Sequence, residues 1–180
     1  MFGSLIILPA GFEEIEALTP IDLLRRANIK LTVAALGYPQ QVTGSHRVEV
    51  LAETTLDACL ENQYDLVILP GGPGYTEYFK SPHLERFLKA QKGYIAAICA
   101  APVALHRFGL LKGKRYTCFP GVRSELKDAS DEPVVVDGKL ITSTGAGTAY
   151  AFSLKLIELL EGKDKAEEIA RETCYFTKLA

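Results

Sequence analysis

Cys99 carries the strongest chemical signal in this sequence. It follows the apolar run Tyr94–Ile98 and is separated from Pro102 by two alanines. Small residues allow a tight turn from strand to helix, and proline suits the first turn of a helix because its missing N–H would have no partner there. The arrangement matches the nucleophile elbow of serine hydrolases. The helix dipole and unpaired N–H groups stabilise a thiolate at such a position, so we expect the pKa of Cys99 to fall from about 8.5 toward or below neutrality.

The alternative interpretation of Cys99 is a core residue, because free cysteine is among the most buried residue types. The other cysteines, Cys59, Cys118 and Cys174, lack a comparable context and are interpreted as structural. The chain contains no C-x-x-C pair, so the sequence predicts neither a zinc site nor a disulfide framework. We therefore expect reduced thiols.

Two glycine-containing turns follow apolar runs. In the first, Leu69–Gly74, paired glycines permit positive φ and leave backbone N–H groups exposed, which could stabilise an oxyanion. The alternative is a tight loop without chemistry. The second turn, Ser143–Thr148, lacks the G-x-G-x-x-G spacing, so we do not expect it to bind phosphate or a dinucleotide. The sequence predicts no bound cofactor and no metal.

Three acidic residues, Glu13, Glu14 and Glu16, stand where the first expected helix begins. Glu13 and Glu14 are interpreted as complements of the helix dipole. Glu16 lies in the turn that passes over the end of the sheet if the apolar face packs inward. That face carries Ile15, Leu18, Ile21 and Leu24. An ionised carboxylate raises the pKa of a nearby thiol and a protonated carboxyl lowers it, so we expect Cys99 and Glu16 to share one charge and titrate together.

The composition is that of an ordinary globular protein. The chain has 180 residues, of which 48% are hydrophobic and 23% charged, and we expect one domain over residues 1–180. Lysine and arginine are scattered and the formal net charge is −2, so no nucleic-acid partner is indicated. The N-terminus lacks the features of a signal peptide, and no apolar stretch approaches the ~18 residues of a membrane span. We expect a cytoplasmic protein that does not associate with membranes.

Short apolar runs alternate with segments of helical period. The expected strands cover residues 4–9, 30–36, 64–69, 94–99 and 114–119, and the expected helices cover 13–28, 83–91, 102–108, 147–161 and 164–174. Two β-rich stretches, 41–54 and 133–143, depart from this alternation, and Asp137-Gly138 in the second predicts a hairpin. Continuous apolar strands separated by helices indicate a mainly parallel sheet covered on both faces, a three-layer α/β sandwich.

Four segments in order, AGFEEIEALTPIDLLRRANIKLTVA, YDLVILPGG, AAICAAPVAL and ITSTGAGTA, resemble the DJ-1/PfpI (ThiJ) superfamily. The resemblance runs almost end to end and is closest to the subgroup of the human parkinsonism-associated DJ-1 protein and bacterial YajL. It implies a flavodoxin-like, class I glutamine amidotransferase-like fold, usually homodimeric, with an easily oxidised elbow cysteine. It also implies that Cys99 is the nucleophile, that Glu16 is the protonated carboxyl beside it, and that the N–H groups of Gly72 and Ala100 are oxyanion donors.

The resemblance implies three hypotheses about function. The first is a cofactor-independent enzyme that acts on a small aldehyde or dicarbonyl, as a glyoxalase III that converts methylglyoxal to lactate or as a deglycase of glyoxal adducts. The second is a redox-sensing, stress-protective chaperone in which Cys99 is oxidised to the sulfinic state. The third, from older descriptions of the family, is a role in thiazole monophosphate biosynthesis, for which no motif here argues.

The sequence also departs from patterns known in the superfamily. Human-type members carry histidine before a proline where this chain has Phe119, which weakens the expectation of efficient glyoxalase chemistry. The protease-like branch places histidine directly after the cysteine, where this chain has Ala100. Amidotransferases need a late histidine and glutamate, and the helix that begins at Gly147 supplies neither. A protease or amidotransferase is therefore not expected.

The three histidines and one further cysteine complete the candidates. His83 and His106 are interpreted as surface residues, whereas His46 is a candidate for the pocket or a dimer interface. By the resemblance, Cys118 points to the same end of the sheet as Cys99. A disulfide between them is possible, although nothing in the sequence supports it.

Overall fold

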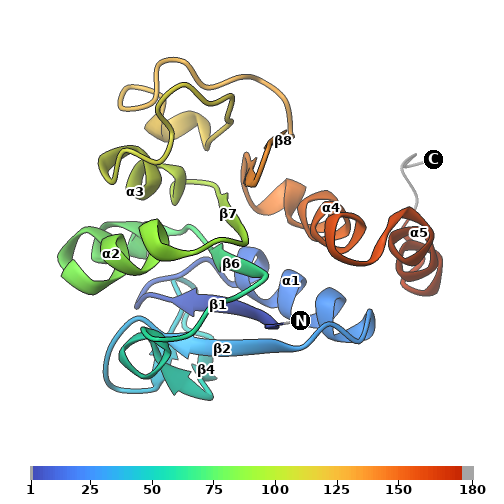
Figure 1. The fold of residues 1–180 in the computed structure, drawn as a ribbon, viewed down its shortest axis with the longest axis horizontal. Helices are drawn as coiled ribbons and strands as arrows, with labels where there is room; N and C mark the ends of the chain where they lie inside the picture. Colours follow the sequence, from blue (N-terminus) through green and yellow to red (C-terminus); the bar gives the residue numbers. More distant parts are fainter. Residues whose placement is uncertain (1, 176–180) are drawn as a thin grey trace.

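The structure is a computed structural model that describes residues 2–175. Its larger sheet contains β1 (Ser4–Leu8), β2 (Leu31–Ala35), β5 (Thr54–Thr55), β6 (Leu66–Leu69), β7 (Tyr94–Ile98), β8 (Val134–Asp137) and β9 (Leu140–Ser143). These seven strands follow the order β5-β2-β1-β6-β7-β9-β8 (Figure 1). All neighbours pair in parallel except β8 and β9, which form the hairpin predicted around Gly138. The predicted flavodoxin-like, mainly parallel α/β fold is confirmed.

Helices surround this sheet. The α-helices are α1 (Glu14–Arg26), α2 (Pro82–Ala90), α3 (Pro102–Arg107), α4 (Ala149–Glu161) and α5 (Lys163–Glu172). Short 3-10 helices are η1 (Leu56–Cys59), η2 (Pro73–Lys80), η3 (Pro120–Val122) and η4 (Ala146–Thr148). Helix α1 packs against α4, and α4 against α5, away from α2 and α3 (Figure 1). No helix among residues 2–175 is long and apolar enough to cross a membrane.

Strand β1 illustrates why the inner strands are continuous apolar runs. All of its residues are buried, and it pairs with β2 on one side and β6 on the other. Because helices cover a parallel sheet on both faces, neither face of such a strand meets water and its sequence does not alternate. Each fully buried leucine or isoleucine stabilises the fold by roughly 1.5–3 kcal/mol relative to an exposed one.

The stretch 41–54 forms a small excursion from the main sheet, as predicted. Strand β3 (Gln41–Thr43) pairs antiparallel with β4 (Glu49–Leu51) in a separate two-stranded sheet. The N–H of Gly11, which follows β1, donates to the carbonyl of Thr43 at 2.8 Å. This bond ties the excursion to the start of α1, and therefore places it beside the candidate site.

Helix α1 presents a different face to the core than its sequence predicts. Ile15 is 53% exposed and Leu18 is 37% exposed, whereas Glu16 and Leu24 are buried. The prediction that Ile15 and Leu18 pack inward is therefore wrong. The physical reason is the Glu16 carboxyl, which accepts a hydrogen bond from the buried N–H of Gly71 and holds that side of the helix toward the sheet.

Residues 114–119 do not form the strand predicted for them. Strand β9 pairs with β7 and occupies the edge that this segment would need. The segment keeps one isolated bridge, between Thr117 and Ser130. At the end of this segment, the N–H of Phe119 donates a hydrogen bond to the carbonyl of Cys99 at 2.8 Å, so the segment is bonded to the turn that carries the cysteine. Helix α3 and this irregular segment thus enclose the turn that carries the cysteine.

Candidate functional site

The turn after β7 holds Cys99 in a strained backbone conformation. Its φ of 65° lies in the left-handed region, which costs a residue with a side chain roughly 1–2 kcal/mol. The N–H of Cys99 donates to the carbonyl of Ser143 at 2.9 Å, so the turn is tied to the end of β9. The side chain is largely enclosed, with the residue 8% exposed. This geometry agrees with the predicted strand-to-helix elbow.

Glu16 lies beside this cysteine and is almost completely buried, at 1% exposed. Its Oε2 accepts a hydrogen bond from the N–H of Gly71 at 2.9 Å. Its Oε1 has no hydrogen-bond partner of standard geometry among residues 2–175. A buried, unpaired carboxyl oxygen is costly as an anion, and a proton on it would supply a donor for the neighbouring thiol.

Burial and neighbouring charge raise the pKa of both groups. Burial, together with the charge of Glu13, raises the pKa of Glu16 to about 7, although the approach of Cys99 and of two backbone amides opposes the change. Burial, the charge of Glu16 and the hydrogen-bonding contact with its carboxylate raise the pKa of Cys99 to about 12, against the amides of Gly72 and Ala100. The predicted pKa toward or below neutrality is therefore wrong for a thiol beside an ionised Glu16. That prediction included the backbone amides, which lower the pKa of the thiol, but left out burial, which raises it.

The two values describe one coupled pair. The first proton leaves near pH 7, and the second leaves only near pH 12 because it would place two negative charges side by side. Two of the three influences that raise the pKa of Cys99 come from ionised Glu16, and they disappear when Glu16 holds a proton. This coupling agrees with the prediction that the pair shares one charge.

The glycine turn after β6 is shaped by the lack of side chains. A Cβ on Gly71 would lie 2.6 Å from the Cβ of Cys99 and 2.7 Å from Oε2 of Glu16. Gly72 has a φ of 89°, and a Cβ there would lie 2.4 Å from the nitrogen of Glu13. The N–H groups of Gly72 and Ala100 approach the sulfur and act to lower the pKa of the Cys99 thiol. Sequence reasoning missed the separate role of Gly71, although the paired glycines were the signal for it.

The Ser143–Thr148 turn also takes part in the site. The hydroxyl of Thr148 interacts with Ser143 Oγ at 2.6 Å, accepts from the N–H of Gly145 at 3.1 Å and donates to the carbonyl of Gly145 at 2.8 Å. These bonds close the turn on itself, and the N–H of Ala146 approaches Glu16. The turn thus positions an amide on the carboxyl, a role that sequence reasoning did not assign.

Phe119 stands at the edge of the site. It is 45% exposed, and its ring lies 3.6 Å from the position that a Cβ on Gly145 would take. Oε1 of Glu16 lies 3.8 Å from the same position. An apolar ring therefore borders the carboxyl at the residue where the resemblance led us to look for histidine. It offers a hydrophobic contact and no proton.

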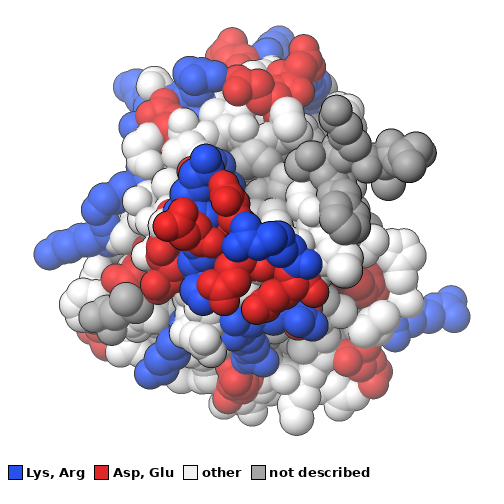
Figure 2. Space-filling model, turned by 90° about the vertical axis from the view of Figure 1, so that its right-hand side faces the viewer, with Lys and Arg blue, Asp and Glu red and all other residues white. Residues whose placement is uncertain are grey.

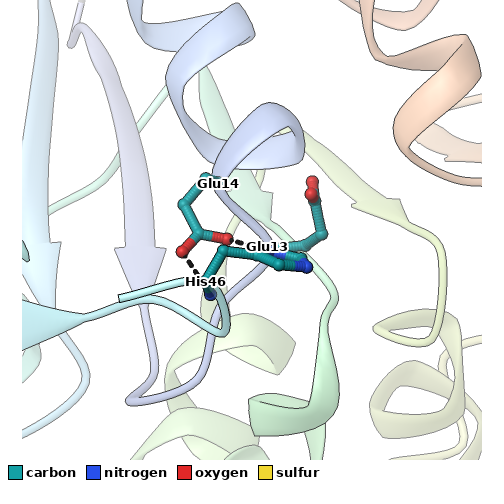
Figure 3. A group of neighbouring side chains, drawn as sticks. All are labelled: Glu13, Glu14 and His46. Atoms are coloured by element: carbon teal, nitrogen blue, oxygen red, sulfur yellow. Dashed lines mark hydrogen bonds and ion pairs between the residues drawn. The ribbon is translucent and has the colours of Figure 1, made fainter. Parts of the chain in front are cut away.

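One group of potential metal ligands lies next to the site, formed by Glu13, Glu14 and His46. Glu14 is buried, and its oxygens accept from His46 N at 2.6 Å, Ser45 Oγ at 3.1 Å and Val48 N at 3.4 Å, and pair with His46 Nδ1 at 2.9 Å. Although burial opposes it, these contacts lower the pKa of Glu14 to about 2. Both dashed lines in Figure 3 join Glu14 to His46. Glu14 thus anchors a loop, a larger role than the predicted dipole complement.

Of the remaining candidates, Glu13 contacts the backbone of Glu16, whereas the histidines do not contact the reactive pair. Glu13 accepts the N–H of Glu16 at 2.9 Å and so caps α1. His46 is exposed and pairs with Glu14, whereas His83 pairs with Asp57 on the surface. His106 is also exposed, as predicted. All four cysteines are free thiols, so Cys99 and Cys118 are not bridged.

The fold and this site define an α/β protein with a cysteine at a strained elbow and a buried carboxyl beside it. The chain belongs to the DJ-1/PfpI family, whose sequence pattern matches residues 4–159. Protein dj-1beta of Drosophila melanogaster is 42% identical over 177 residues, which cover 94% of this chain and 95% of that protein. The glutathione-independent glyoxalase DJR-1.2 of Caenorhabditis elegans is 32% identical over 180 residues, 96% of each. The solved structure of oxidized Toxoplasma gondii DJ-1 has a TM-score of 0.92 at 36% identity and covers 97% of this chain and 99% of that one.

Proposed function

We propose that this protein acts on small dicarbonyl compounds without a cofactor, as a glyoxalase that converts methylglyoxal to lactate or as a deglycase of related adducts. The observation that carries the proposal is the pair formed by Cys99 at the elbow and Glu16 beside it, with a pKa of about 7 for the carboxyl. A general acid or base works best when its pKa lies near the operating pH. The glyoxalase name of the Caenorhabditis elegans relative supports the same reaction class.

The proposed reaction begins when the thiolate of Cys99 attacks the aldehyde carbon. A C–S bond forms, the carbonyl electrons move to oxygen, and that oxygen takes the proton of Glu16, which gives a hemithioacetal. The amides of Gly72 and Ala100, which approach the sulfur, are candidates to stabilise the oxyanion.

Glu16, now a carboxylate, then accepts the proton from the former aldehyde carbon, and an enediolate forms with its charge on the oxygen of the adjacent carbon. Glu16 returns this proton to the adjacent carbon, and the hydroxyl proton passes to the charged oxygen, which gives a lactoyl thioester. Water hydrolyses this thioester to lactate and the free thiol. Methylglyoxal and water together account for every atom of lactate, so no oxidant or reductant is required.

A second candidate function is redox sensing at the same sulfur. Peroxide would transfer one oxygen to the thiolate and release water, and a second peroxide would carry the sulfenic acid to the sulfinic acid. A protonated carboxyl at Glu16 would donate a hydrogen bond to the oxidised sulfur. The similarity to a structure named oxidized DJ-1 favours this candidate. The thiazole hypothesis gains no support. In the Ser143–Thr148 turn, where a phosphate would bind, the hydroxyl of Thr148 already bonds to Ser143 and to the backbone of Gly145.

We also propose that the protein is a homodimer. The exposed apolar side chains of α1 and the β3–β4 excursion support this: Ile15, Leu18, Val48 and Leu51 are 53%, 37%, 44% and 76% exposed. Large exposed apolar groups that gather on one region are typical of protein interfaces.

We further propose that residues 1–180 form a single domain, because one core cluster includes residues from Leu5 to Ile169. We also propose that the protein resides in a reducing compartment such as the cytoplasm, because the four thiols are free. Acidic and basic side chains intermingle on the face in Figure 2, which gives no basic stripe there for nucleic acid.

Lactate formation from methylglyoxal tests the enzymatic proposal. We expect Cys99→Ala to abolish turnover and Glu16→Gln to reduce it by about 10²-fold or more, because general acid–base catalysis contributes about that much. Cys174→Ala is the matched control, since that thiol is exposed and lies outside the site. Reduced wild-type protein that forms no lactate, yet is converted by peroxide to a stable sulfinic acid at Cys99, would favour the redox function instead.

A further inference from the structure

A cavity of about 680 Å³ lies at the end of the sheet opposite Cys99. We call it the basal cavity. Its walls come from residues at or near the start of β1, β6, β7 and β9 and from the end of α4. Tyr94 begins β7 and lines the cavity, whereas Cys99 directly follows the same strand. The five residues of this strand span about 16 Å at about 3.3 Å each, so the basal cavity is separate from the reactive pair.

Three lysines, Lys30, Lys92 and Lys139, line the basal cavity. Within residues 2–175, none of them forms an ion pair. Lys139 Nζ donates to the carbonyl of Lys92, which holds this ammonium at the wall. Two acidic residues, Asp65 and Glu161, also line the cavity. The carboxylate of Asp65 already accepts hydrogen bonds from two backbone N–H groups. The cavity therefore has an excess of positive charge.

Ser4 is a second, independent sign of a ligand. This residue lines the basal cavity and is 1% exposed, and its Oγ has no hydrogen-bond partner among the described residues. A buried hydroxyl left unpaired costs about 1–3 kcal/mol, and most such groups in proteins have a partner. The Oγ is almost inaccessible to solvent, so an oxygen atom of a ligand in the cavity would accept the proton of this hydroxyl after a small movement of the wall.

Apolar and aromatic side chains form much of the remaining wall. They are Phe2, Ile29, Tyr64, Tyr94, Leu159 and Leu160. Phe2 is 68% exposed, so much of a large apolar ring beside the cavity is not covered by the described residues. Cavities of about 300–1,000 Å³ with apolar walls and a few polar groups are typical of small-molecule sites.

We propose that the basal cavity binds a small anionic amphiphile, a carboxylate with an apolar chain or ring. The carboxylate contacts the lysine ammonium groups and the Ser4 hydroxyl, and the apolar body packs on the aromatic and leucine side chains. Lysine supplies a compact positive charge that suits such a head group. The site goes beyond the proposed dicarbonyl activity, because neither Cys99 nor Glu16 contributes to it.

Titration of the ¹⁵N-labelled protein with octanoate tests this proposal, with 1-octanol and octylamine as neutral and cationic analogues. We expect octanoate to produce saturable amide shifts at Gly3, Ser4, Gly93 and Tyr94, and to bind at least tenfold more tightly than either analogue. Shifts confined to the surroundings of Cys99, the absence of saturable shifts, or equal binding of 1-octanol would each overturn the proposal.

Variants separate the charge and the hydroxyl. The double variant Lys92→Gln/Lys139→Gln is expected to lose at least tenfold in octanoate affinity, and Ser4→Ala about threefold. Lys112→Gln is the matched control, because Lys112 is exposed and lies outside the cavity. Cys99→Ala is expected to bind octanoate like the wild type even if it forms no lactate. Unchanged affinity in the double variant would overturn the assignment of the head group to the lysines, and unchanged affinity in Ser4→Ala would overturn its assignment to the hydroxyl.

Discussion

Replacement of Glu16 by glutamine removes a buried carboxyl whose ionisation lowers the free energy of unfolding as the pH rises. Glu16 is 1% exposed, and its pKa is about 7 compared with an ordinary 4.5. Because the pKa of Glu16 is raised in the folded state, the contribution of this one group to stability is fully present below pH 4.5 and is lost as the pH rises through 7. At about 1.4 kcal/mol per pKa unit, the full loss is about 3 kcal/mol.

The assay is urea unfolding followed by circular dichroism, since the chain has no tryptophan for fluorescence. Between pH 4.5 and pH 8.5 we expect the unfolding free energy of the wild type to fall by about 3 kcal/mol relative to that of Glu16→Gln. All other ionisable residues are the same in both proteins, so their contribution cancels from the difference. Glu85→Gln, on the surface of α2, is the matched control and should follow the wild type. Parallel curves for wild type and Glu16→Gln would refute the claim that Glu16 is protonated by burial.

Four further changes test the site and the dimer. Cys99→Gly should be about 1 kcal/mol more stable than Cys99→Ala in urea unfolding, because φ is 65° there, and equal stability would contradict the strain. Gly71→Ala should lose roughly 1–3 kcal/mol, because its Cβ would lie 2.6 Å from that of Cys99, whereas Gly147→Ala, with open space, should lose little. Phe119→His should raise lactate formation at least about tenfold by supplying a proton-transfer group, and a folded variant without a gain would contradict this. Ile15→Lys should shift the sedimentation coefficient from dimer to monomer, and a monomeric wild type would refute the dimer.

The order of elements could be predicted from the sequence because the central strands β1, β6 and β7 are largely apolar runs. The Asp137-Gly138 pair gave the β8–β9 hairpin for a similar reason, since Gly138 adopts the positive φ that the turn needs. The run 114–119 begins with Lys114 and Arg115 and is less apolar, and β9 already occupies the adjacent edge. Strand pairing is a long-range choice, and the composition of one segment does not determine it.

The candidate site was predictable wherever local backbone geometry dictates the residue type. Alanines, proline and glycines around Cys99 indicated the elbow and the glycine turn. The inward face of α1 was mispredicted because a hydrogen bond to Gly71, 55 residues away, turns Glu16 to the interior at the expense of Ile15. The pKa of Cys99 depends on burial and on the charge of Glu16, which only the folded arrangement defines.

The pH dependence of Cys99 alkylation tests most directly the claim that Cys99 and Glu16 share one negative charge and that the thiolate reacts while the carboxyl holds the proton. Iodoacetamide labelling from pH 5 to pH 10, resolved by mass spectrometry, separates Cys99 from the exposed Cys174, which serves as an internal reference for the reagent. The account predicts a rate constant for Cys99 that rises with a midpoint near pH 7 and then stays level to pH 10, because the second proton leaves only near pH 12. A rate constant that instead rises tenfold per pH unit throughout this range would contradict it.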